Sequence, residues 1–159
     1  MSHVRDDEPL PGYFRLFQGV DGSSVDMHET HGKLESRQNI PIALFLAARG
    51  ERVRLLPVLR VPGSKCPDAT RNEVEWEFKV PEGRTANAID QALRGANRQA
   101  ARVLIQVAQE FNIQVLEQAI HGRVRRAENI LEVAVLLADV LHHFSRLEIL
   151  NNTFRGKMG

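Results

Sequence analysis

Three residues in the middle of the chain have the types and spacing that metal-assisted attack on a phosphodiester requires: Asp68, Glu77 and Lys79. Asp68 follows a proline, and Glu77 comes after a further eight residues. If these residues lie on adjacent strands, about 4.8 Å apart, their carboxylates can chelate one hard cation such as Mg²⁺ or Mn²⁺. Lys79 leaves the same strand face as Glu77, so its ammonium can hold the attacking water or stabilise charge on phosphorus.

This spacing resembles the core of PD-(D/E)XK nucleases. That core usually takes a further carboxylate from a helix before the first strand, and Glu35 is the candidate by position, with Glu29 second. Helix capping or a surface ion pair is the alternative role of either residue. For Glu77 and Lys79 the alternative is an ordinary ladder of charges on an exposed strand face.

A second cluster allows a different chemistry. His28 and His31 flank Glu29 and Thr30, and such a pair can bind Zn²⁺ or act as general acid and base. The sequence offers no third metal ligand at a convincing spacing, so surface or loop histidines are the simpler interpretation. A metal-independent RNase that uses His28 or His31 is therefore kept as an alternative to the metal-dependent enzyme.

Arginines outnumber lysines by 17 to four among the basic residues, and seven of the arginines lie within residues 84–126. Residues 84–126 hold seven arginines against three acids, whereas residues 1–35 hold three basic and seven acidic side chains. Arginine suits bidentate contacts with phosphate better than lysine does. The candidate nucleic-acid contacts are Arg94, Arg98 and Arg102, which we expect on one helix face, and Arg123, Arg125 and Arg126 on the following link. A solvated helix face is the alternative.

Composition restricts the class of protein. The chain has 159 residues, 43% of them apolar, and a net charge of only +1, which indicates a globular protein and excludes a polybasic one. A single cysteine excludes an internal disulfide framework and fits a reducing compartment such as the cytoplasm. No apolar run approaches the roughly 20 residues that span a bilayer, and no secretion signal is expected, so we predict no membrane partner.

Hydrophobic periodicity predicts the elements that position these residues. We expect a flexible arm over residues 1–11 and one domain over residues 12–159. The expected strands cover residues 12–18, 24–27, 51–59, 73–80, 103–107 and 131–138, and the expected helices cover residues 35–48, 85–101 and 112–126. Residues 144–150 give only a weak signal. The order predicts a single layered α/β domain, a mixed central sheet flanked by helices, with an N-terminal hairpin extension.

Several short blocks resemble bacterial nuclease modules, namely the C-terminal tRNA-cleaving toxin domains of contact-dependent growth inhibition proteins and related mobile-element and phage proteins. The blocks are His28–Glu35, Ala43–Ala47, Leu55–Pro57, Pro67–Ala69, Trp76–Lys79, Asn87–Ile89, Gln99-Ala100 and Gly122–Arg126. The resemblance spans roughly residues 25–150. Residues 139–143 form a longer and more apolar stretch than the short polar turn that the resemblance predicts there. The sequence therefore does not establish the last hairpin of the family.

The resemblance implies a nuclease that acts on structured RNA in preference to DNA. When the module serves as a toxin, the resemblance also implies an immunity protein as its partner. Asp68, Glu77 and Lys79 would be catalytic, with Glu35 or Glu29 completing the site. A delivered toxin would act in the cytoplasm of the target cell. The remaining alternative is a non-catalytic module that binds nucleic acid or another protein.

Overall fold

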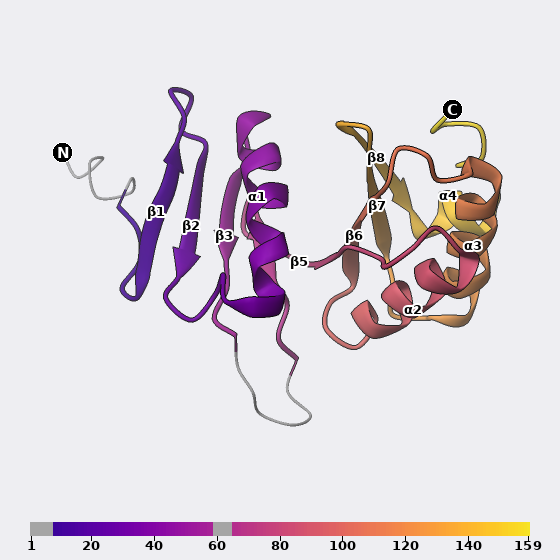
Figure 1. Cartoon of the computed structure of the whole chain (residues 1–159), viewed down its shortest axis with the longest axis horizontal. Coiled ribbons are helices and arrows are strands. Elements are labelled where there is room, and N and C mark those ends of the chain that lie inside the picture. The colour runs from indigo at the N-terminus through magenta and orange to yellow at the C-terminus, as the bar shows by residue number, and fades with distance from the viewer. Residues whose placement is uncertain (1–7, 59–64) are drawn as a thin grey trace. The chain divides into compact units, whose positions relative to one another are not determined.

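A computed structural model describes residues 8–58 and 65–159. The chain divides into two compact units, the first ending at Glu75 and the second beginning at Trp76 (Figure 1). The described residues form eight strands and four α-helices, which confirms the mixed α/β class. The prediction of one domain over 12–159 stays a prediction, and the arm predicted over 1–11 lies mostly outside the described residues.

The first unit is a four-stranded mixed sheet with one helix. Its elements are β1 (Tyr13–Gln18), β2 (Ser24–His28), the 3-10 helix η2 (Leu34–Gln38), α1 (Asn39–Ala48), β3 (Arg52–Leu55) and β4 (Ala69–Arg71). The β1 and β2 strands form the predicted hairpin, but β2 also pairs in parallel with β3, so the hairpin is part of the sheet and not an extension of it. The β3 and β4 strands are antiparallel.

Alternation along β2 and β3 divides the residues of this sheet between two faces. Val25 and Met27 leave one face of β2, in register with the buried Val53 and Leu55 of β3. Helix α1 contacts both strands and buries its own Leu46. Polar side chains, including Asp26, occupy the alternate positions. The first unit therefore has one apolar face beneath a helix and one polar face.

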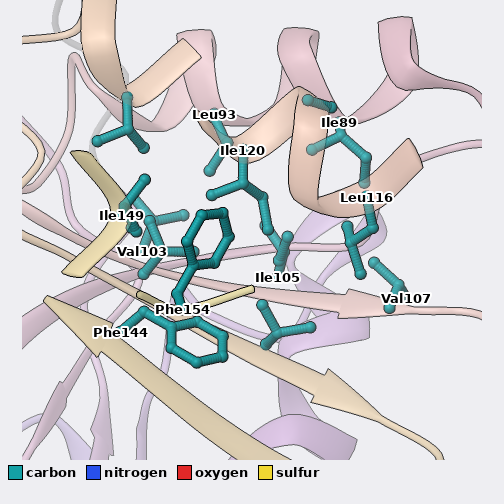
Figure 2. Close-up of a cluster of buried hydrophobic side chains, with 14 of the residues drawn as sticks. Ile89, Leu93, Val103, Ile105, Val107, Leu116, Ile120, Phe144, Ile149 and Phe154 are labelled. Atoms are coloured by element: carbon teal, nitrogen blue, oxygen red, sulfur yellow. The ribbon is translucent and has the colours of Figure 1, made fainter. Parts of the chain in front are cut away.

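The second unit is built from two crossovers between parallel strands. Its elements are β5 (Val74–Lys79), α2 (Ala86–Ala96), β6 (Arg102–Val107), α3 (Ile113–Arg126), β7 (Glu132–Leu137), β8 (Val140–Ser145) and α4 (Arg146–Leu150). The strands β5, β6 and β7 are parallel to one another, and β8 returns antiparallel to β7. Side chains of α2 and α3, among them Leu93 and Ile120, pack with Val103 and Ile105 of β6 in one buried cluster (Figure 2).

Two predicted elements of this unit need correction. The helix predicted over 85–101 ends at Ala96, with Asn97 as its C-cap, because the chain has to return to the sheet to start β6 at Arg102. The strand β8 was not predicted. Its turn consists of Ala138 and Asp139, which both have positive φ angles of 50° and 60°. Glycine or asparagine is the usual sign of such a turn, and neither stands there.

The described residues include no helix that is both long and apolar enough to cross a membrane.

Candidate functional site

Strand β5 presents Glu77 and Lys79 on one face and Trp76 and Phe78 on the other. Both aromatic side chains are buried. Glu77 lies in register with Val103 of β6, whose side chain belongs to the core beneath α2 and α3. The Glu77–Lys79 side of β5 therefore faces the helices of the second unit.

The Lys79 ammonium lies 3.5 Å from the Glu77 carboxylate, and a Cβ at Gly95 of α2 would be 3.6 Å from Lys79 Nζ. The Glu77 side chain is only 6% exposed, whereas that of Lys79 is 32% exposed. A buried carboxylate is costly unless a cation or hydrogen-bond donor stands beside it. The pair is therefore a buried acid whose compensating charge reaches solvent.

Asp68 stands directly before β4, in the first unit. This short strand is not among those expected from hydrophobic periodicity. The Leu56 N–H donates to the Asp68 carbonyl oxygen at 2.9 Å, which extends the pairing of β3 with β4 by one step. Since Asp68 belongs to the first unit and Glu77 and Lys79 to the second, their convergence on one cation stays a prediction.

The remaining candidate carboxylates, Glu35 and Glu29, lie in the first unit, between the start of the β2–α1 connection and η2. Glu35 lies in η2, and its side chain falls outside the described residues. Glu29 is exposed, just after β2. Among the residues that the structure describes, no group of three or more His, Cys, Asp and Glu side chains is arranged to hold a metal ion.

The two histidines differ in environment. His31 is 2% exposed, and its Nδ1 donates to the Leu56 carbonyl at 2.7 Å while its Nε2 accepts from the Asn39 amide at 3.2 Å. His28 is half-buried, and its Nδ1 accepts from the Thr30 hydroxyl at 2.8 Å. With both ring nitrogens engaged and its ring covered, His31 is a structural histidine, so the metal-independent alternative depends on His28.

Burial lowers the pKa of His31, against the opposing effects of the Leu56 carbonyl and the Asp68 charge. The folded protein therefore binds a proton at His31 less readily than the unfolded chain, whose histidine pKa is about 6.5. We expect the free energy of unfolding to fall as the pH drops below about 6.5 and to be fully retained above it. Chemical denaturation between about pH 7.5 and pH 5.5 measures this loss.

His31→Gln is expected to flatten that pH dependence and to lower stability at pH 7.5 by about 1–3 kcal/mol, because the Leu56 and Asn39 groups lose a well-placed partner. Burial lowers the pKa of His142 as well. That residue is present in both proteins, so its effect cancels in the difference. An equal loss of stability in both proteins on acidification would contradict the assignment.

The arginine candidates occupy different elements. Arg94 lies in the last turn of α2, Arg98 lies beyond the helix end, and Arg102 starts β6, where it pairs with Glu132 at 3.4 Å. The three do not share one helix face, which corrects the premise of their prediction. Arg123, Arg125 and Arg126 lie in the last turn of α3 and not on a link after it.

Asp90 of α2 is an acidic partner of these arginines that no local pattern in the sequence indicates. Arg123 binds it with two hydrogen bonds of 2.7 and 2.9 Å, and Arg126 approaches to 3.7 Å. The Arg123 hydrogen bonds are the main cause of the lowered pKa of Asp90, to which Arg126 and Arg94 add. Arg123 thus ties α3 to α2, while Arg94, Arg98, Arg125 and Arg126 remain exposed.

Comparison with known proteins gives two matches. Residues 65–136 match the family described as "Contact-dependent growth inhibition CdiA C-terminal domain". That segment, less than half of the chain, contains Asp68, Glu77 and Lys79 together with all six candidate arginines. No curated protein matches.

The fold is similar to a chain of the solved structure described as "CdiA-CT/CdiI toxin and immunity complex from Burkholderia pseudomallei". The similarity has a TM-score of 0.54 at 17% identity and covers 69% of this chain and 83% of that one. At this identity the match concerns the fold. The PD-(D/E)XK core predicted from the residue spacing stays a prediction.

Proposed function

We propose that this protein is a metal-dependent nuclease that hydrolyses phosphodiester bonds of structured RNA such as tRNA. Asp68 and Glu77 hold the cation, and Glu35 or Glu29 completes the carboxylate set. Lys79 orients the attacking water and balances negative charge on the phosphoryl oxygens. Bound Mg²⁺ or Mn²⁺ supplies Lewis-acid polarisation of the phosphate.

The observation that carries the proposal is the buried Glu77 beside the Lys79 ammonium on the helix-facing side of β5. A surface charge ladder would leave both side chains in solvent, whereas the Glu77 carboxylate is covered and the Lys79 side chain is only 32% exposed. Carboxylate oxygens are the ligands that Mg²⁺ prefers. The same short segment supplies Asp68 and lies within the match to the growth-inhibition family.

The direct test is to incubate the protein with total RNA and with plasmid DNA in the presence of Mg²⁺. We expect the RNA to be cleaved and the DNA to persist. Cleavage of plasmid DNA alone would support a nuclease but would contradict RNA as its substrate. Degradation of neither nucleic acid would favour the non-catalytic binding module.

The exposed arginines at the ends of α2 and α3 support a nucleic-acid substrate. We expect Arg94→Gln combined with Arg126→Gln to weaken RNA binding in EDTA and to reduce the dependence of log Kd on log salt by about 0.7 for each lost contact with a single strand. Binding titrations between about 50 and 200 mM KCl measure both quantities.

Arg37→Gln is the control for this double variant, because Arg37 is exposed in η2, in the other unit. Unchanged affinity and salt dependence in the double variant would assign Arg94 and Arg126 to a solvated helix face.

We further propose that the nuclease is a delivered toxin, neutralised by an immunity protein and active in the cytoplasm of the target cell. The family match to a growth-inhibition C-terminal domain and the similarity to a chain of a toxin and immunity complex support this part of the proposal. Expression of the chain in bacteria should arrest growth, and the catalytic variants below should not.

A further inference from the structure

The polar face of the first unit carries a row of side chains that crosses all four strands. Arg15 of β1 is in register with Asp26 of β2, Asp26 with Arg54 of β3, and Arg54 with Thr70 of β4. No single segment of the sequence contains this row, because it is formed by strand pairing. An open hollow on this face is lined by Ser24, Asp26, Arg52, Arg54, Thr70 and Glu73.

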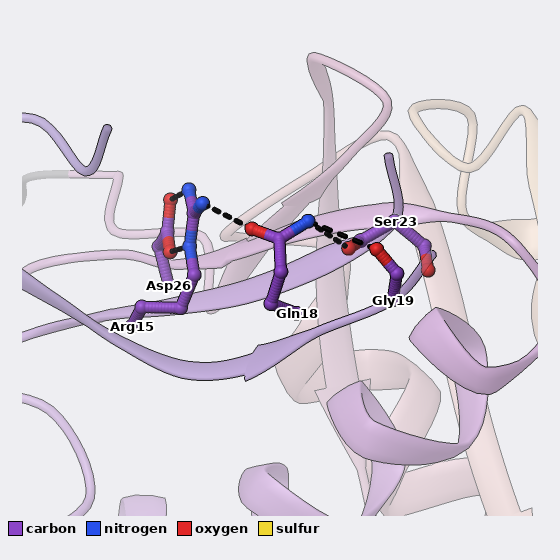
Figure 3. Close-up of polar contacts among 5 residues, drawn as sticks. All are labelled: Arg15, Gln18, Gly19, Ser23 and Asp26. Atoms are coloured by element: carbon purple, nitrogen blue, oxygen red, sulfur yellow. Dashed lines mark hydrogen bonds and ion pairs between the residues drawn. The ribbon is translucent and has the colours of Figure 1, made fainter. Parts of the chain in front are cut away.

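Asp26, the buried acid of the hollow, is already neutralised. The Arg15 guanidinium binds it through two hydrogen bonds, Nε to Oδ1 at 2.7 Å and Nη2 to Oδ2 at 3.0 Å (Figure 3). Arg15 also donates to Gln18, whose amide in turn donates to the carbonyls of Gly19 and Ser23. This network holds the Arg15 fork in place, so Asp26 does not need the charge of Arg54.

The positive charge of Arg54 is only weakly compensated by its ion-pair partner. Its Nη1 lies 3.4 Å from Glu73, whose side chain is 71% exposed, and an ion pair of that kind contributes little. Its Nε is buried without a hydrogen-bond acceptor among the described residues. The guanidinium is held over the Tyr13 ring, 5.9 Å from the centroid. A buried N–H donor without an acceptor is costly, and an anionic oxygen in the hollow would bind this guanidinium at Nη1, in place of Glu73.

We propose that this hollow binds a backbone phosphate of the RNA substrate, with Arg54 as the principal ligand and Arg52 beside it. The Ser24 and Thr70 hydroxyls on the same face are further donors. Charge complementarity selects this occupant. The row and the hollow together contain three arginines, Arg15, Arg52 and Arg54, and two carboxylates, those of Asp26 and Glu73. Arg15 binds the Asp26 carboxylate.

This inference rests on the proposed nuclease function and adds a substrate contact that the helix arginines do not provide. It makes two predictions of opposite sign. Arg54→Gln should raise the Kd for RNA in EDTA about fivefold to tenfold and reduce the salt dependence by about 0.7. Glu73→Gln should lower the Kd about twofold to threefold, because the exposed carboxylate competes with phosphate for Arg54.

The matched control is Arg49→Gln. Arg49 is exposed at the end of α1 in the same unit, and its guanidinium lies 5.7 Å from the Phe45 ring centroid, so the substitution removes the same charge and the same kind of ring contact. Anisotropy titrations of a labelled tRNA, without metal, measure all four proteins. Thermal melts show whether Arg54→Gln is folded, and Glu73→Gln tests the site without altering a buried group.

Unchanged affinity in both Arg54→Gln and Glu73→Gln, while the wild type binds and cleaves RNA, would overturn this site and leave the nuclease standing. A wild type that neither binds nor cleaves RNA would overturn both. Titration with inorganic phosphate separates the two sources of the anion. If Arg54→Gln weakens phosphate binding but leaves tRNA binding unchanged, the hollow is not a surface for RNA.

Discussion

Glu77→Gln is expected to lower the rate of RNA cleavage by about 100-fold or more, because the cation that would polarise the phosphate loses one of its anionic ligands. The amide keeps the volume of the side chain but cannot supply an anionic oxygen to the cation. Asp68→Asn should act in the same way. Lys79→Met should cost about 10²–10³ in rate, because the water and the phosphoryl oxygens lose their cationic partner. Initial rates on one defined tRNA measure all three.

Glu75→Gln is the matched control, since Glu75 lies on the same face of β5 two residues before Glu77 but is exposed. It should retain the wild-type rate. Thermal melts identify any variant that fails to fold, which matters most at Glu77 because removing its charge leaves Lys79 without its carboxylate. Full activity in folded Glu77→Gln would eliminate the proposed site and support the ordinary charge ladder.

Chelation of divalent cations should abolish cleavage, and Mg²⁺ or Mn²⁺ should restore it. The carboxylates alone carry no group that polarises the phosphate, so we expect the residual rate in EDTA to equal the background of buffer without protein. Titration calorimetry gives a readout that does not depend on activity. The wild type should bind Mn²⁺, whereas Asp68→Asn and Glu77→Gln should bind it more weakly or not at all.

His28→Ala separates this mechanism from the metal-independent alternative. We expect its cleavage rate to match that of the wild type, because the proposed chemistry does not use an imidazole. Cleavage that survives EDTA and is lost in His28→Ala would reverse the assignment. His31→Ala is a poorer probe, since this buried ring binds Leu56 and Asn39 and its removal disturbs the fold.

Local patterns in the sequence were enough to predict most of the elements. Hydrophobic periodicity predicted a strand over residues 73–80, where the structure has β5. It also predicted a helix over residues 112–126, where Asn112 accepts a hydrogen bond from the Val115 N–H as the cap of α3. These features depend on neighbours within a few residues, which is the range over which strand alternation and helix capping act. The candidate triad could be named for the same reason, from its spacing along one segment.

Other features depend on residues that are distant in the sequence. Helix α2 stops at Ala96 although helix-forming residues follow, because the parallel pairing of β5 with β6 requires the chain to return to the sheet. The arginine-rich sequence makes Arg123 a candidate phosphate ligand. In the folded protein it binds Asp90 instead, which lies 33 residues earlier in the chain. A charge count cannot distinguish the two roles, because it does not contain the packing of α3 on α2.

The Arg54 hollow is the clearest case of a feature that only tertiary structure decides. Arg15, Asp26, Arg54 and Thr70 have no common motif, and three strand pairings bring them into one row. By itself the sequence determined the residue types, the periodicity of most elements and the chemistry that we propose for Asp68, Glu77 and Lys79. The register between strands decided which charges neutralise one another and which face a ligand, because register is set by the burial of a whole sheet face and not by any local pattern.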